Sequence, residues 1–281
     1  MTPPKSGALI AIGGAEDRTA ESQILRRVLD FVTCDPFEVG VITTASRFPA
    51  DAYSAYLKAF GALGAQAVHH LDVPDRAAAR DQEQLAALDS CDLIFIAGGD
   101  QLRLTNVLGG SPFLEAMRAR HAEGSVVAGT SAGAAALTAT MIYDGAASNA
   151  LRKGAVKMAS GLAFARGIVI DSHFLERGRF TRLMEVGTTN PEYVGVGIGE
   201  DAAVVIHPGP VLEAVGPGLV IIVDSSQLRH TNVVELEVGE PVAVEHVIMH
   251  ALASGYGYDV KRRAFIDAHT EWPVPPEPEP A

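Results

Sequence analysis

Short apolar runs alternate with amphipathic stretches along the first half of the chain. The apolar runs are continuous, as in strands that are buried on both faces. The stretches between them repeat apolar residues at helical spacing. This alternation predicts an α/β fold built on a mostly parallel open sheet with helices on both faces. The predicted strands are residues 8–12, 39–43, 67–71, 93–97 and 125–128, and the predicted helices are residues 24–32, 53–63 and 82–88.

The second half of the chain has more strand signals than helix signals. Its apolar runs follow one another closely and are separated by Gly/Pro turns. We expect later parallel strands plus an antiparallel extension of the same sheet. Because no shift in composition marks a boundary, residues 1–270 are predicted to form a single domain, followed by a Pro/Glu-rich disordered tail over residues 271–281. The predicted strands are residues 168–170, 194–198, 202–206, 211–215 and 219–223.

Composition and charge narrow the class of protein. The chain has 281 residues, 48% hydrophobic and 20% charged, as is typical of globular proteins. Its 22 Lys and Arg against 34 Asp and Glu give a net charge of −12, which disfavours nucleic acids and anionic membranes as partners. No apolar run is long enough to span a membrane, and the first residues lack the pattern of a signal peptide. Cys34 and Cys91 are too few for a disulfide framework, so we expect a cytoplasmic protein.

The strongest chemical signal is the segment Gly129–Gly133, GTSAG, with Ser131 at its centre. It follows an apolar run and precedes an alanine-rich stretch, which is the strand–turn–helix context of a nucleophile elbow. Its small residues permit a sharp turn that exposes the serine hydroxyl. The helix N-terminus beneath the turn has free N–H groups, so the Ala132 N–H is a candidate oxyanion donor. The alternative is a tight turn with a packing role alone.

A nucleophilic serine needs a base and a group that orients the base. His173 is the best placed of the nine histidines because it follows an apolar strand, where open α/β sheets build their sites. Glu200 and Asp201, which follow another apolar strand, are the candidates for the orienting acid. A second glycine turn, Gly98–Gly99, makes the Gly99 N–H a second candidate oxyanion donor.

Arginines gather around these residues in an otherwise acidic chain. A guanidinium group binds carboxylates through two parallel hydrogen bonds, so the grouping predicts recognition of substrate carboxylates, with surface salt bridges as the alternative. No cluster has the spacing of metal ligands, and His69 and His70 are expected to be a surface pair. The Gly13–Gly14 turn lacks the spacing of a dinucleotide or phosphate loop, so we expect no cofactor. The arginines are Arg103, Arg177, Arg179 and Arg182.

Five segments taken together resemble cyanophycinase, a family of serine peptidases grouped with the aspartyl dipeptidase called peptidase E. The resemblance runs in order from about residue 7 to about residue 225. The combination is far more specific than the serine motif alone. The segments are residues 13–18 (GGAEDR), 97–104 (AGGDQLRL), 129–134 (GTSAGA), 170–183 (IDSHFLERGRFTRL) and 197–205 (GIGEDAAVV).

The resemblance implies a flavodoxin-like fold similar to that of the class I glutamine amidotransferases, with serine in place of their cysteine. It implies Ser131 as nucleophile, His173 as general base and Glu200 as the orienting acid, and Asp201 and Asp171 remain alternatives for the acid. The implied substrate is cyanophycin, a poly-aspartate chain with arginine on each side-chain carboxyl. The implied product is the dipeptide β-Asp-Arg, released stepwise from a chain end, and a homodimer is implied as well. The residues implied to line the substrate pocket are Gln101, Asp171, Arg177, Arg179 and Arg182.

Two positions differ from the family pattern. The family has glutamine before the histidine and aspartate before the acid, where this chain has Ser172 and Gly199. Ser172, expected to line the same pocket, reaches less far than glutamine and has no amide, so a substrate hydrogen bond is lost or made by water. An aspartyl or β-aspartyl dipeptidase on the same fold is therefore the main alternative.

Two further hypotheses are less favoured. An α/β-hydrolase esterase also uses G-x-S-x-G, but its acid precedes its histidine along the chain. Here His173 precedes Glu200, and the later His250 and His269 lack a strand-end context. A non-catalytic homologue is disfavoured because all three members of the predicted triad are present. The expected partner is thus a peptide with aspartyl and arginyl units.

Overall fold

The computed structural model describes residues 6–19, 21–146, 148, 151–268 and 272. The tail predicted over residues 271–281 lies outside these described residues, apart from Trp272. The Trp272 indole N–H donates a hydrogen bond to the Gly255 carbonyl at 2.9 Å, and its ring stacks on His207. This part of the predicted tail is therefore packed against the strands.

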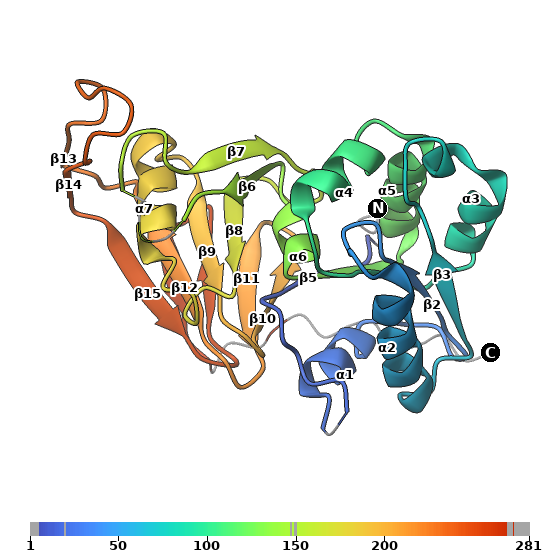
Figure 1. The fold of residues 1–281 in the computed structure, drawn as a ribbon. Coiled ribbons are helices and arrows are strands. Elements are labelled where there is room, and N and C mark those ends of the chain that lie inside the picture. Colours follow the sequence, from blue (N-terminus) through green and yellow to red (C-terminus); the bar gives the residue numbers. More distant parts are fainter. Residues whose placement is uncertain (1–5, 20, 147, 149–150, 269–271, 273–281) are drawn as a thin grey trace, which may run out of the picture.

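A nine-stranded sheet is the larger of the two main sheets (Figure 1). Its parallel part consists of β1 (Leu9–Ile12), β2 (Glu38–Ile42), β3 (Ala67–Leu71), β4 (Leu93–Ile96) and β5 (Val126–Thr130). These strands lie in the order β1, β5, β4, β2, β3, each parallel to its neighbour. The α/β fold on a mostly parallel sheet is thus confirmed, and each of these strands lies where an apolar run predicted one.

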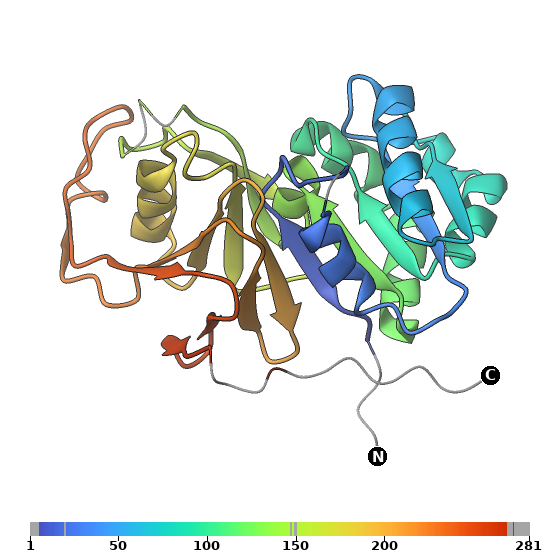
Figure 2. The same cartoon turned by 90° about the horizontal axis from the view of Figure 1, so that it is seen from below.

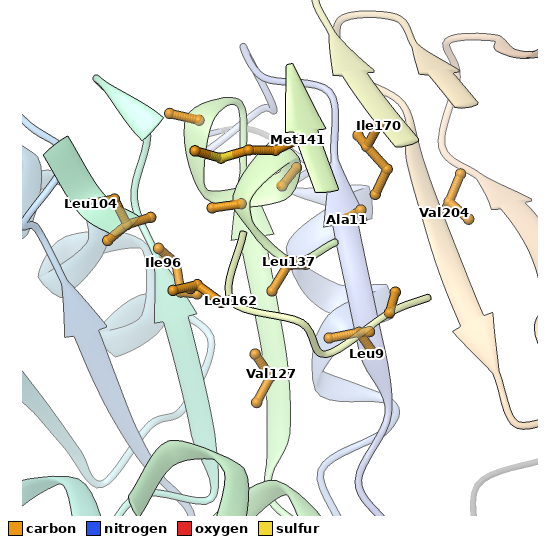
Figure 3. Packing of buried hydrophobic residues seen from close by; sticks show 14 of the residues in the cluster. Leu9, Ala11, Ile96, Leu104, Val127, Leu137, Met141, Leu162, Ile170 and Val204 are labelled. Atoms are coloured by element: carbon orange, nitrogen blue, oxygen red, sulfur yellow. The ribbon is translucent and has the colours of Figure 1, made fainter. Parts of the chain in front are cut away.

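Helices cover both faces of the parallel strands, as predicted. Successive side chains of a strand point to opposite faces, so Ile10 and Ile12 pack in one layer and Leu9 and Ala11 in the other. Figure 3 shows Leu9 and Ala11 in the second layer, beside Val127. The first layer holds α1 (Gln23–Leu29) and α2 (Pro49–Ala62), and the second holds α3 (Gln82–Asp89), α4 (Gln101–Leu108), α5 (Pro112–Glu123) and α6 (Ala132–Ala136).

Helices α4 and α5 were not predicted from apolar spacing. Both begin at capping residues that could have revealed them. Asp100 Oδ1 accepts the Arg103 N–H at 3.0 Å, and Ser111 Oγ accepts the Leu114 N–H at 3.2 Å. Pro112 at the first position of α5 is a further helix-start signal.

The later strands do not all join the first sheet, contrary to prediction. A separate four-stranded sheet contains β8 (Ile168–Ser172), β9 (Val194–Ile198), β12 (Val220–Asp224) and β15 (Ile248–Leu252), of which only β8 and β9 are parallel to each other. An apolar run predicts that a strand is buried, but its partner is chosen by contacts far away in sequence. The strands that do extend the first sheet, antiparallel as predicted, are β10 (Ala203–His207), β11 (Val211–Val215), β16 (Gly257–Asp259) and β17 (Ala264–Ile266).

The two sheets share one buried cluster. Ile170 of β8 packs in the same cluster as Leu9 and Val127 of the first sheet (Figure 3). The opposite face of the second sheet is covered by α7 (Phe180–Thr189). Figure 2 shows the second sheet with α7 at one end of the molecule and the helix-covered parallel sheet at the other. The remaining elements are η1 (Ala78–Arg80) and the antiparallel pairs β6 (Thr140–Asp144) with β7 (Lys157–Ser160) and β13 (His230–Thr231) with β14 (Val244–Glu245).

Candidate active site

Ser131 occupies a sharp turn between β5 and α6. Its backbone has a positive φ of 53° with ψ −110°, a conformation that side chains rarely adopt. Two glycines make room for the turn. A Cβ at Gly129 would lie 2.6 Å from the Gly133 carbonyl carbon, and a Cβ at Gly133 would lie 2.4 Å from the Ile96 carbonyl oxygen. The strand–turn–helix context expected around Ser131 is therefore present.

The Ser131 hydroxyl meets the imidazole of His173. Ser131 Oγ lies 2.9 Å from His173 Nε2, and His173 Nδ1 lies 2.7 Å from Glu200 Oε1. The three residues follow β5, β8 and β9, so the two sheets together build the site. With Nδ1 donating its proton to the Glu200 carboxylate, Nε2 presents a lone pair to the serine hydroxyl. This arrangement allows the imidazole to take a proton from Ser131 Oγ.

The other two candidates for the orienting acid have different partners. Asp201 Oδ1 accepts the Asp17 backbone N–H at 3.3 Å. Asp171 forms ion pairs with two arginines. Among these three described carboxyl groups, Glu200 is the one that contacts His173.

The turn after β1 fixes the position of His173. The His173 backbone has a positive φ of 48°, and its N–H donates to the Gly13 carbonyl at 2.9 Å. Gly14 has φ 105°, and a Cβ there would lie 2.4 Å from His173 Cε1. The imidazole therefore packs directly on the Gly14 backbone, a role that the sequence did not predict although GGAEDR is one of the resembling segments.

Gly14→Ala is expected to lower kcat by about 100-fold, because the added methyl group displaces the imidazole from Ser131. Gly64→Ala is the matched control, since Gly64 has a similar φ of 98° but no atom within 4 Å of the added Cβ. Steady-state kinetics of both variants against the parent measure the difference. Equal activity of the two variants would contradict the packing role of Gly14.

Of the two predicted oxyanion donors, Ala132 directly follows Ser131, and Gly99 follows a glycine that lies against the serine. A Cβ at Gly98 would be 3.3 Å from the Ser131 Cβ, which places the Gly98–Gly99 turn against the serine. Gly99 has φ 146°, and a Cβ there would lie 2.0 Å from the Ala45 carbonyl oxygen, so a side chain does not fit. The Ala132 N–H lies in the first turn of α6, where an amide has no acceptor within the helix.

The arginines expected to bind substrate carboxylates surround a buried aspartate. Arg179 Nη1 lies 2.9 Å from Asp171 Oδ1, and Arg182 Nε lies 3.0 Å from Asp171 Oδ2. The Asp171 and Arg182 side chains are 3% and 7% exposed, whereas Arg177 lies on the exposed loop before α7. Burial raises the pKa of the Asp171 carboxyl, and the charges of Arg182 and Arg179 oppose that rise. Two guanidinium groups on one carboxylate leave a surplus of positive charge here.

Asp171→Asn is expected to lower the free energy of unfolding by about 3 kcal/mol or more, because it leaves the buried guanidinium group of Arg182 and the half-buried one of Arg179 without their counterion. Asp144→Asn is the control, since Asp144 forms an exposed ion pair with Lys157 at 2.9 Å and its loss should leave Tm nearly unchanged. Urea unfolding of both variants measures the two effects. Equal stability of the two variants would show that the Asp171 cluster contributes nothing.

The other residues expected to bind substrate lie around this cluster and on α4. Gln101 Nε2 donates to the Ile142 carbonyl at 2.9 Å. Arg103 is exposed on the first turn of α4. Ser172 is 6% exposed, and its carbonyl accepts a hydrogen bond from Arg179 Nη1 at 2.7 Å. The short side chain of Ser172 is thus buried at the end of β8.

A buried carboxylate beside the serine turn was not predicted. Glu16, in the loop after β1, is 5% exposed. Its Oε2 accepts the Thr130 hydroxyl at 2.6 Å, and its Oε1 accepts the Tyr56 hydroxyl at 2.5 Å. Glu16 belongs to the GGAEDR segment, but Tyr56 lies on α2 and is 40 residues away in sequence, so no local pattern could pair them.

No group of three or more His, Cys, Asp or Glu within the described ranges could hold a metal ion. His69 and His70, expected to be a surface pair, are both partly buried, and each ring has its own partner. His69 Nε2 lies 2.7 Å from Glu38 Oε2, and His70 Nε2 lies 2.8 Å from the Thr43 hydroxyl. In the part of the chain that the structure describes, no helix has the length and apolar character needed to cross a bilayer.

The region that contains Ser131, His173 and Glu200 matches the model of one protein family. The model of peptidase family S51 matches residues 9–213. The chain belongs to peptidase family S51. Family S51 peptidases are serine-type enzymes, so the expectation of a serine-type peptidase is confirmed.

Curated relatives of this S51 peptidase carry the name cyanophycinase. The one from Trichormus variabilis is 35% identical over 262 residues, which cover 93% of this chain and 88% of the relative. The one from Synechococcus elongatus is 37% identical over 256 residues, which cover 91% of this chain and 80% of the relative. The resemblance to the cyanophycinase and peptidase E group, expected from five segments, is thus confirmed.

Solved structures with low sequence identity share the S51 fold. The structure of a peptidase from an acI-B1 Actinobacterium has a TM-score of 0.63 at 18% identity, and the match covers 90% of this chain and 97% of that one. A putative peptidase E protein from Listeria monocytogenes EGD-e has a TM-score of 0.52 at 17% identity, and the match covers 75% and 98%. Both likenesses support the flavodoxin-like fold class.

Proposed function

We propose that this protein is a cyanophycinase-like serine exopeptidase, which hydrolyses cyanophycin (multi-L-arginyl-poly-L-aspartate) to β-Asp-Arg dipeptides. The observation that carries the proposal is the hydrogen-bonded series from Ser131 through His173 to Glu200. It occurs in a chain that is 35% and 37% identical to proteins named cyanophycinase. No metal or cofactor takes part in the proposed reaction.

Acylation begins with the Ser131 hydroxyl. His173 Nε2 takes the proton as Ser131 Oγ attacks the carbonyl carbon of the scissile amide. Glu200 holds the imidazole through Nδ1 and stabilises the imidazolium that forms. His173 then gives the proton to the leaving amine as the C–N bond breaks, and an acyl-enzyme remains on Ser131. Water, deprotonated by His173, hydrolyses that ester and releases the acid.

Two backbone N–H groups stabilise the tetrahedral intermediate in this mechanism. The Gly99 and Ala132 N–H groups lie in the two turns that meet at Ser131. Each donor fixed in position before the reaction is worth about 3 kcal/mol of transition-state stabilisation. A Cβ on Gly99 would lie 2.0 Å from the Ala45 carbonyl oxygen, so glycine lets this turn pack against the backbone at Ala45.

We place one part of the substrate at the Asp171 cluster. Cyanophycin carries a free α-carboxylate on every arginine, and the surplus positive charge of the cluster attracts that group. Exposed Arg177 and half-buried Arg179 are the members that reach the substrate. The buried Asp171 carboxylate pairs with Arg179 and Arg182 and so fixes the position of Arg179. The proposed substrate-binding residues are Gln101, Asp171, Ser172, Arg177, Arg179 and Arg182.

An aspartyl or β-aspartyl dipeptidase is the second candidate function. Ser172 favours it, because a buried serine cannot extend an amide towards cyanophycin as the glutamine of the family pattern can. At the other departure from that pattern, a Cβ on Gly199 would lie 3.6 Å from Glu176 Oε1. An aspartate at that position would therefore face a second carboxylate.

Relative values of kcat/KM for three substrates test the proposal. The substrates are cyanophycin, an N-terminal aspartyl dipeptide and a p-nitrophenyl ester. We expect kcat/KM for cyanophycin to exceed that for the dipeptide by at least about 100-fold. A higher value for the dipeptide would support the second candidate, and hydrolysis of the ester alone, with no cleavage of cyanophycin or the dipeptide, would favour the esterase hypothesis.

We further propose that the enzyme works in the cytoplasm as a homodimer, with residues 1–270 as one catalytic domain. Its net charge of −12 disfavours binding to nucleic acids and anionic membranes. Sedimentation of the purified protein tests the dimer. A single species of the protomer mass, 29.5 kDa, would contradict it.

A further inference from the structure

A pocket of about 220 Å³ opens beside the nucleophile. It lies between the loop after β1, the helix α2 and the serine turn, away from the residues that the proposed substrate site uses, except for Ser131 itself. Its polar lining is provided by Glu16, Arg18, Tyr56, Thr130 and Ser131. The rest of the lining consists mainly of alanines and glycines, which leave the space open.

The inner wall of the pocket is a fixed hydrogen-bond network. Glu16 accepts one hydroxyl on each carboxylate oxygen, from Thr130 at 2.6 Å and from Tyr56 at 2.5 Å. Tyr56 is 4% exposed. Burial and the neighbouring charge of Glu16 raise the pKa of the Tyr56 hydroxyl, so the hydroxyl stays protonated and donates to Glu16. The wall therefore has a defined geometry before any substrate arrives.

The outer wall carries a cation, the guanidinium group of Arg18. The Arg18 guanidinium carbon lies 5.4 Å from the centre of the Tyr56 ring, and the residue is exposed. Within the described ranges, no aspartate or glutamate forms an ion pair with Arg18. The Tyr56 ring thus holds the guanidinium at the mouth of a pocket that contains the nucleophile.

We propose that Arg18 binds a free carboxylate of the substrate in this pocket, next to the bond that Ser131 attacks. The inference deepens the proposed function and rests on Ser131 being its nucleophile. Cyanophycin offers such a carboxylate on each arginine unit. One unit can then reach the Asp171 cluster while its neighbour reaches Arg18.

The network favours a carboxylate over the guanidinium group of the substrate. Among the described residues that line the pocket, Glu16 is the only acid. It is buried, and both of its oxygens already accept short hydrogen bonds. A substrate guanidinium would also meet the like charge of Arg18. A carboxylate meets an exposed guanidinium group that can donate several hydrogen bonds.

Labelling of Ser131 by a matched pair of probes tests the proposal. One probe is a diphenyl phosphonate analogue of β-Asp-Arg with a free carboxylate on the arginine, and the other is its carboxamide twin. Ser131 Oγ attacks the phosphorus of either probe, and phenol leaves. We expect the parent protein to be labelled about 10- to 100-fold faster by the carboxylate probe.

Two variants of Arg18 and one control locate that preference. Both probes should label the Arg18→Gln variant at equal rates. The Arg18→Lys variant keeps the positive charge, so it should keep part of the preference for the carboxylate probe. Arg80→Gln removes an exposed arginine of η1 and should match the parent. The proposal would be overturned if Arg18→Gln kept the full preference for the carboxylate probe. It would also be overturned if both probes labelled the parent protein at equal rates. The Tm of each variant verifies folding.

Cyanophycin hydrolysis measured on the same samples separates this proposal from the proposed function. If the parent protein prefers the carboxylate probe through Arg18 but releases no β-Asp-Arg, the carboxylate site is supported and cyanophycin is contradicted as the substrate. If the parent protein releases β-Asp-Arg but shows no preference for the carboxylate probe that depends on Arg18, the proposed function is supported and the carboxylate site is contradicted. A protein that neither probe labels at Ser131 overturns both.

Discussion

Ser131→Ala is expected to lose about 10⁶-fold in kcat on cyanophycin, which corresponds to about 8 kcal/mol of transition-state stabilisation. The loss is this large because the hydroxyl forms the covalent bond, and its Oγ is the atom that meets His173 Nε2 at 2.9 Å. Steady-state release of β-Asp-Arg measures the effect.

The same substitution should leave the fold intact. The Ser131 hydroxyl hydrogen-bonds to His173, and alanine keeps the Cβ that lies against Gly98. The contacts of Gly129 and Gly133 do not involve the Ser131 side chain. The Tm of Ser131→Ala should therefore stay within a few degrees of the parent, about the shift produced by 1 kcal/mol in a chain of this size. A variant that is folded and still turns over at more than about one hundredth of the parent rate would exclude Ser131 as the nucleophile.

Glu200→Gln is expected to lower kcat by about 10⁴-fold. The amide can present its N–H₂ to His173 Nδ1, which favours the tautomer with the proton on Nε2 and removes the lone pair that accepts the serine proton. The variant keeps the size of the side chain, so packing is unchanged. Hydrolysis of cyanophycin at constant pH measures the loss.

Asp201→Asn is the matched control for that substitution. Asp201 is the neighbouring acid, but its Oδ1 accepts the Asp17 backbone N–H rather than contacting His173. Asparagine tolerates the positive φ of 48° at this position, so the backbone need not change. We expect a less than about 10-fold change in kcat. A larger loss in Asp201→Asn than in Glu200→Gln would reverse the assignment of the acid.

The parallel sheet could be predicted because each of its strands is an apolar run between helical stretches. β1, β2, β3, β4 and β5 all lie within a few residues of the predicted positions. The division of the later strands between two sheets could not be predicted. Residues 194–198 and 203–207 are both largely apolar and mostly buried, yet the first segment pairs with β8 and the second with β1. Such pairing depends on contacts far apart in sequence.

The nucleophile turn was predictable because its chemistry lies within five consecutive residues. The choice between Glu200 and Asp201 was not, because adjacent residues after a strand point to different neighbours and spacing alone cannot say which one meets His173. The partners of the arginines could not be predicted from spacing either. Their density predicted carboxylate binding, but Asp171 from the end of β8 already pairs with Arg179 and Arg182.

The most direct test of the account is incubation of purified cyanophycin with the protein, with Ser131→Ala in parallel and the products identified by mass. We predict that the parent releases β-Asp-Arg and that the variant does not. Absence of β-Asp-Arg from the parent, while Ser131 still reacts with a serine-directed reagent, would contradict cyanophycin as the substrate. Equal release by the parent and by Ser131→Ala would contradict the serine mechanism itself.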